Sequence, residues 1–84
     1  MPTVLRAGGY QFIIFTSDHS PAHVHVRREG KLAKVRLDPI EFERTGGFNA
    51  GERSRILEIV REHKEFLLTE WRKLYPPEEM EGDA

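Results

Sequence analysis

The spacing of apolar residues divides the chain into a first half typical of β-strands and a second half typical of an α-helix, with the change at about Asn49. Four short runs in the first half are rich in strand-forming residues, and turn residues separate them. These runs are Thr3–Arg6, Tyr10–Phe15, His23–Arg28 and Lys31–Leu37. Glycines follow the first and third runs and can adopt the positive φ that tight turns require. The pattern therefore predicts two antiparallel hairpins.

A helix is predicted from Asn49 to the prolines at 76 and 77. Asn49 and Glu52 have the spacing of a capping box, in which each side chain bonds the backbone amide of the other residue. Apolar residues then recur at three- and four-residue intervals, as on a helix that packs against a core. They are Ile56, Leu57, Ile59, Val60, Phe66, Leu67, Leu68, Trp71, Leu74 and Tyr75.

The predicted fold class is α+β, with about four short antiparallel strands in two hairpins, followed by one long C-terminal helix packed on one sheet face. Asp38 and Pro39 are expected to end the fourth strand, because proline cannot donate a ladder hydrogen bond, and Ile40–Gly47 is expected to be a connector. Residues 1–77 are predicted to form a single domain. The acidic stretch 78–84 is predicted to be a flexible tail.

Size and composition narrow the class of protein. The chain has 84 residues, enough for one core, and its 13 basic and 14 acidic side chains leave no bulk positive charge to indicate nucleic-acid binding. The absence of cysteine favours a reducing compartment. The longest apolar run, Phe12–Phe15, is too short to cross a bilayer, and the N-terminus has no secretory signal pattern. We therefore expect a cytoplasmic protein that does not enter membranes. An uncovered edge strand would also allow a homodimer.

Candidate chemistry lies on the third and fourth predicted strands, where residues two apart share a face. The valines of His23–Arg28 lie on one face of the third strand, and His23, His25 and Arg27 lie on the other. On the fourth strand, Lys34 and Arg36 alternate with apolar residues in the same way. If the valines pack under the helix, two histidines and three cations line the open face.

One interpretation of this face is a site that acts on RNA. Arg27, Lys34 and Arg36 could hold phosphates and stabilise charge that develops on their oxygens. His23 and His25 could serve as general base and acid when a ribose 2′-hydroxyl attacks the adjacent phosphate, because imidazole titrates near neutral pH.

Two other interpretations use the same residues. In the first, Asp18, His19, His23 and His25 bind zinc or another divalent first-row metal, since imidazoles two apart on a strand can converge on one ion. In the second, the histidines are solvated or contact a partner, and the charges keep an exposed face soluble. Only the metal interpretation requires a cofactor.

The chain resembles a small bacterial family known as domain of unknown function 4160. The matching segments are Pro2–Arg6, Gly9-Tyr10 with Phe12, Asp18–Val26, Ala33-Lys34 and Leu37–Pro39, before a helix with a late tryptophan. The block from Asp18 to Val26 is the specific part, and Ala22 stands where a second proline is usual. The resemblance implies a cytoplasmic bacterial protein, often encoded beside another small domain in pairs that look like toxin and antitoxin modules. It assigns no catalytic residue.

Residues and resemblance together predict one component of a toxin-antitoxin-like module, an effector that acts on RNA through His23, His25, Lys34 and Arg36. The alternative is a non-enzymatic interaction module that binds a cognate small protein through the same face. A metal-binding domain that uses the histidine cluster is the third alternative. Whether the chain is an enzyme stays open at this point.

Overall fold

A computed structural model describes residues 3–15 and 21–75 of the chain. These residues form a five-stranded antiparallel sheet in which each strand pairs with the next one along the chain. The strands are β1 (Thr3–Ala7), β2 (Tyr10–Ile13), β3 (His23–Arg28), β4 (Lys31–Leu37) and β5 (Ile40–Arg44). Two helices, α1 (Ala50–Glu62) and α2 (Lys64–Leu74), follow the sheet. The α+β class and both predicted hairpins are confirmed.

The fifth strand corrects the prediction that Ile40–Gly47 is a connector. Asp38 and Pro39, joined by a cis peptide bond, form a tight turn after β4, and the chain returns as β5. Proline does not disturb a ladder from this position, because it lies in the turn and not in a strand. Residues 40–44 alternate apolar and charged side chains, as a strand with one buried face requires.

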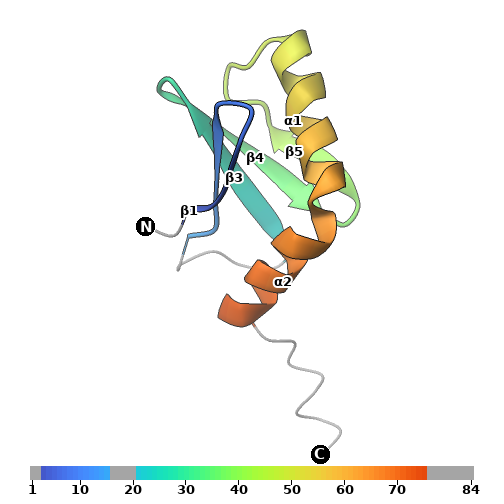
Figure 1. Ribbon diagram of the computed structural model, residues 1–84. Coiled ribbons are helices and arrows are strands. Elements are labelled where there is room, and N and C mark those ends of the chain that lie inside the picture. The colour runs from blue at the N-terminus through green and yellow to red at the C-terminus, as the bar shows by residue number, and fades with distance from the viewer. Residues whose placement is uncertain (1–2, 16–20, 76–84) are drawn as a thin grey trace, which may run out of the picture.

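The single predicted helix is two helices that meet at His63. At this residue φ is −112° and ψ is 20°, away from helical values, and its backbone N–H donates to the carbonyls of both Ile59 and Val60. The His63 ring also bonds the Ile59 carbonyl through Nδ1, at 2.9 Å. The chain therefore changes direction here, and α2 runs past one end of the sheet (Figure 1).

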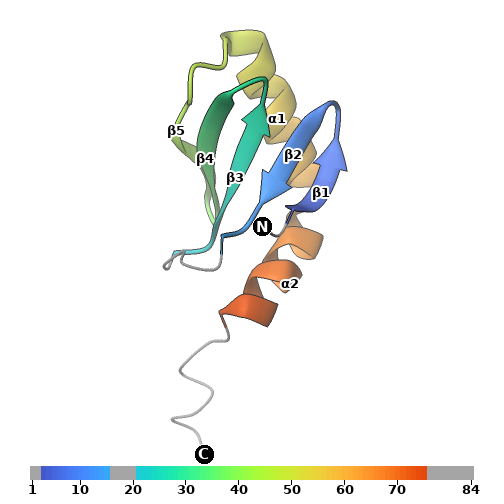
Figure 2. The same cartoon turned by 90° about the vertical axis from the view of Figure 1, so that its left-hand side faces the viewer.

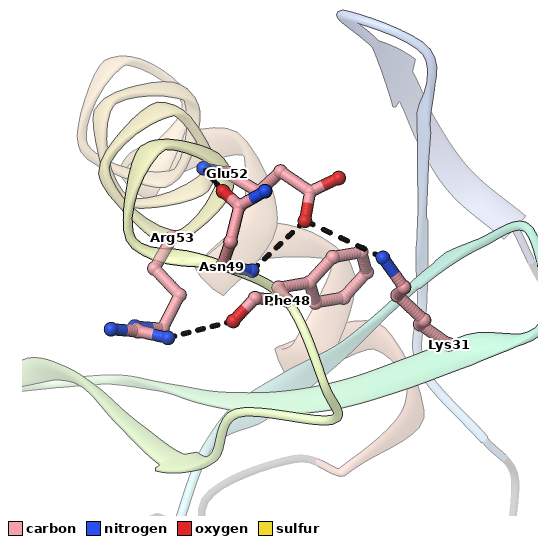
Figure 3. Close-up of polar contacts among 5 residues, drawn as sticks. All are labelled: Lys31, Phe48, Asn49, Glu52 and Arg53. Atoms are coloured by element: carbon pink, nitrogen blue, oxygen red, sulfur yellow. Dashed lines mark hydrogen bonds and ion pairs between the residues drawn. The ribbon is translucent and has the colours of Figure 1, made fainter.

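The predicted capping box begins α1 and is shown in Figure 3. The Glu52 amide donates to Asn49 Oδ1 at 2.8 Å, and the Asn49 amide donates to Glu52 Oε1 at 2.9 Å. Lys31 Nζ lies 3.6 Å from the same carboxylate oxygen and so connects β4 to the start of the helix. The backbone bond from Asn49 and the charge of Lys31 lower the pKa of Glu52 below its ordinary value.

α1 lies over one face of the sheet, α2 continues from it past one end of the sheet, and the other face has no helix lying over it (Figures 1 and 2). The core between sheet and helices contains Ile14, which directly follows β2, and the apolar residues of the inner strand faces, namely Tyr10, Phe12, Val24, Val26, Ala33, Val35 and Leu37. Ile56, Ile59 and Val60 of α1 and Leu67 and Trp71 of α2 pack on them. The prediction that the valine face lies under the helix is therefore confirmed.

In the described part of the chain, no helix is long and apolar enough to span a membrane. The predicted tail at 78–84 and the last two residues of the predicted domain, 76 and 77, lie outside the described residues.

Candidate functional site

Three rows of side chains cross the open face of the sheet, which is the face toward the viewer in Figure 2. Strand pairing defines the rows, because directly opposed residues point to the same side. The first row contains Arg6, Gln11, Arg27 and Leu32, the second contains Ile13, His25 and Lys34, and the third contains His23, Arg36 and Glu41. The predicted site residues of β3 and β4 therefore share one surface, as their spacing implied.

His23 shares this face but is covered, with an exposed fraction of only 3%. Its ring lies 5.2 Å from the ring of Trp71 and 5.1 Å from that of His25, measured between centroids. The expectation that both histidines face solvent is therefore wrong for His23, because α2 extends past the end of the sheet and brings Trp71 against it.

The hydrogen bonding of His23 fixes its tautomer. Its Nδ1 lies 2.9 Å from the carbonyl oxygen of Pro21, which can only accept a hydrogen bond. Nδ1 therefore carries a proton, and in the neutral ring Nε2 has the lone pair. A histidine oriented in this way holds a fixed position beside His25.

His25 is half-buried and contacts the ring of Phe15 edge-on, with centroids 4.6 Å apart. Ile13, opposite His25 on β2, is fully buried although it has the parity of the open face. The end of this face near α2 is therefore aromatic and apolar. The sequence prediction, which followed only the charged positions, missed this character.

Lys34 and Arg36 are both paired with carboxylates of β5. Lys34 Nζ lies 3.1 Å from Glu43, and Arg36 lies 3.4 Å from Glu43 and 3.6 Å from Glu41. The hydrogen bond from Lys34, together with the charges of Lys34 and Arg36, lowers the pKa of Glu43 below its ordinary value. The sequence prediction missed both glutamates, although the alternation of residues 40–44 is the signal that places them on this face.

Arg27 has a different environment. Its Nε and Nη2 donate to Gln11 Oε1 at 3.1 and 2.9 Å, and its side chain is exposed. Among the described residues Arg27 forms no ion pair with a carboxylate. A ligand at Arg27 therefore does not compete with a carboxylate of the described residues, whereas a ligand at Lys34 or Arg36 competes with Glu41 and Glu43.

Two of the four ligands in the metal interpretation, Asp18 and His19, lie outside the described residues. Within residues 3–15 and 21–75, no group of three histidine, aspartate or glutamate side chains could hold a metal ion. Metal binding by Asp18, His19, His23 and His25 stays a prediction.

The fold and this face define a small α+β domain with a meander sheet, two helices on one face and a charged and aromatic surface on the other. Residues 9–72 match the model of the family described as a domain of unknown function, DUF4160. The chain belongs to this family, which confirms the resemblance. No curated protein and no solved structure matches it.

Proposed function

We propose that the domain binds single-stranded RNA on the open face of its sheet. The observation that supports this most is the juxtaposition of cations with the half-buried ring of His25 on the sheet face opposite α1. Lys34 and Arg36 lie beside His25, and Arg27 lies one row away. Cations hold the phosphates of a nucleic acid, and aromatic and histidine rings stack on unpaired bases.

An RNA-binding site needs fewer accessible side chains than a ribonuclease active site does. A ribonuclease that uses both histidines needs both rings to reach the scissile phosphate, and Trp71 covers His23. In a binding site, His23 can act as a buried support for His25, while His25 and the cations contact RNA. Cleavage by His23 and His25 stays a prediction.

The β5 carboxylates favour a second candidate, a non-enzymatic module that binds a cognate small protein. Glu41 and Glu43 alternate with Lys34 and Arg36 on the same face, and a surface of both signs suits a protein with a complementary pattern. The two candidates differ in what the glutamates do, since they repel RNA but would attract cations of a protein partner.

Removal of the charges of Glu41 and Glu43 distinguishes RNA binding from binding of a protein partner. In a Glu41→Gln, Glu43→Gln variant, we expect tighter binding to a single-stranded RNA, because Lys34 and Arg36 are released to contact phosphates. Each added phosphate contact should steepen the dependence of log Kd on log salt by about 0.7. Fluorescence anisotropy over a salt series measures both quantities.

A matched control is Glu58→Gln, Glu70→Gln, which removes two carboxylates that form comparable ion pairs on the helices. It should leave RNA affinity unchanged. A Lys34→Gln, Arg36→Gln variant should weaken binding and flatten the salt dependence. RNA affinity that is equal in all four proteins would exclude the open face as the binding surface. If the Glu41→Gln, Glu43→Gln variant binds a protein encoded by a neighbouring gene more weakly than the parent does, the second candidate is supported.

In the cell, we propose that the domain is the effector of a two-protein, growth-regulating module in the cytoplasm, as the family resemblance suggests. The same variants provide the readout. Induced expression of the parent chain should slow bacterial growth, and Lys34→Gln, Arg36→Gln at equal abundance should not. Normal growth with the parent chain would remove the effector role and leave RNA binding to be judged from the titrations.

A further inference from the structure

The turns of the two N-terminal hairpins lie at the same end of the sheet, the end opposite α2 (Figure 2). A depression of about 500 Å³ lies between them, lined by Gly9, Gln11, Arg27, Arg28, Glu29 and Gly30. A second depression, of about 300 Å³, is lined by residues 6–11. Gly9 and Gln11 line both, so the two depressions are neighbours at the hairpin turns, and we call them together the trough.

Three arginines line this trough, and two of them are held in place by neighbours. The guanidinium of Arg28 lies over the ring of Tyr10, 5.1 Å from its centroid. Arg27 gives two of the five N–H donors of its guanidinium to Gln11, which leaves the others for a ligand. Arg6 is exposed on β1, directly opposite Gln11. The donors are therefore partly organised before any ligand binds.

The backbone at the turns lets a ligand approach closely. Gly9 and Gly30 have φ values of 84° and 80°, which side-chain-bearing residues rarely adopt. A Cβ added at Gly9 would lie 3.6 Å from the guanidinium carbon of Arg28, whereas one at Gly30 would have no heavy atom within 4 Å. The Arg28 guanidinium therefore lies against Gly9, whereas the space beside Gly30 is open.

The charge balance of the trough is positive. Among the described residues, none of Arg6, Arg27 and Arg28 forms an ion pair with a carboxylate. Two acids oppose them: Glu29 lines the trough, and Glu52 is close enough for the charge of Arg28 to lower its pKa. Lys31 already contacts Glu52, so Glu29 is the main local charge against an anion.

We infer that this trough is an anion site that binds phosphate groups mainly through Arg27 and Arg28, which line the larger depression from opposite faces of the sheet, with Arg6 bordering the smaller depression. Guanidinium forks match the tetrahedral oxygens of phosphate, and planar bidentate contacts make arginine better suited to such a ligand than lysine. The phosphate can belong to an RNA strand that continues from the open face, or to a free phosphate compound. The site stands on its own geometry and does not depend on the proposed RNA binding.

Titration with pyrophosphate, followed by ¹H–¹⁵N NMR of the Gly9 and Gly30 amides, tests the site directly. We expect Arg28→Gln to weaken pyrophosphate binding about tenfold, the usual effect of losing a charge-assisted contact. Glu29→Gln should strengthen it, because the opposing charge is removed. Arg61→Gln is the matched control, since Arg61 is an exposed arginine in the last turn of α1 that lines neither depression. A thermal melt of each variant confirms that it is folded.

The inference is overturned if pyrophosphate does not shift the Gly9 and Gly30 signals, or if Arg28→Gln and Arg61→Gln bind it equally well. Competition identifies the source of the phosphate. RNA that displaces pyrophosphate from these amides supports a backbone phosphate as ligand, and RNA that binds without displacing it supports a free phosphate compound. Pyrophosphate binding without any RNA binding would support the trough and refute the proposed function.

Discussion

At the residue scale, Gly46 is the described glycine with the least room for a side chain. Its φ is 66°, and a Cβ there would lie 2.3 Å from the carbonyl oxygen of Leu32. The contact is with backbone, which cannot move aside as a flexible side chain can. The loop after β5 therefore packs directly on the start of β4, and this packing positions Phe48 and the N-terminus of α1.

Gly46→Ala should lower the free energy of unfolding by more than the conformational cost of a left-handed residue alone, which is about 1–2 kcal/mol. Gly30→Ala is the matched control, because φ is 80° there but a Cβ meets nothing within 4 Å. Urea unfolding of both variants gives the comparison. Equal losses would mean that the approach of Gly46 to Leu32 does not constrain the loop.

Sequence reasoning predicted the glycine turns of the hairpins but had no means to predict this role of Gly46. A hairpin turn is a local property, visible in glycines between two strand-forming runs. The approach of Gly46 to Leu32 is a tertiary contact between segments that the sequence does not show to be neighbours. The same limit applies to His23, whose spacing gave the correct face but not the tryptophan that covers it.

At the scale of single elements, patterns that depend on near neighbours were predicted correctly. The faces of β3 and β4 follow from alternation, and the start of α1 follows from the capping box. The strand β5 was not predicted, because Asp38 and Pro39 end the fourth strand and residues 40–47 were expected to be a connector, although the alternation of residues 40–44 is that of a strand. The break at His63 has no comparable signal, since apolar residues continue at helical spacing across it.

The capping box predicts a pH dependence of stability. The backbone bond from Asn49 and the charge of Lys31 lower the pKa of Glu52 from its ordinary value of 4.5. A group with a lowered folded pKa contributes stability above its unfolded pKa, and this contribution is lost as the pH falls through the folded value. Parent and Glu52→Gln proteins should therefore differ in melting temperature near neutral pH and converge below pH 4.5.

Glu62→Gln is the control for this measurement. Glu62 is exposed in the last turn of α1, where a carboxylate gains nothing from the helix dipole. Its replacement should not lower stability near neutral pH. A difference between the parent and Glu52→Gln that persists unchanged to low pH would show that the box acts through shape and not through the charge of Glu52.

At the scale of the whole molecule, the two ends of the open face differ, because α2 contacts only one of them. At one end, Trp71 contacts His23, and the Tyr75 hydroxyl donates to the Phe15 carbonyl across 60 positions of sequence. At the other end, the hairpin turns lie beside α1 (Figure 2). Three arginines line the depressions there. The sequence predicted one uniform basic face, because strand parity gives the face of a residue but not what covers it.

Most of the stability that α2 contributes should come from its contacts with the end of the sheet. Trp71→Ala removes a buried side chain and should cost about 3–5 kcal/mol, a large share of the stability of a small domain. Tyr75→Phe removes only the hydroxyl donor and should cost about 1 kcal/mol. Leu74→Ala, at a side chain 41% exposed on the same helix, should change stability by less than about 0.5 kcal/mol.

Chemical modification of the histidines measures how well the docking of α2 covers His23 in the candidate site. In the parent protein, diethyl pyrocarbonate should modify His25 faster than His23, because Trp71 covers His23 and leaves His25 half-buried. In Tyr75→Phe, which we expect to stay folded because only one hydrogen bond is lost, weaker docking of α2 should raise the rate at His23 while the rate at His25 stays the same. Mass spectrometry of the digested protein gives both rates. Equal protection of His23 in parent and variant would mean that Trp71 holds its position without the Tyr75 contact.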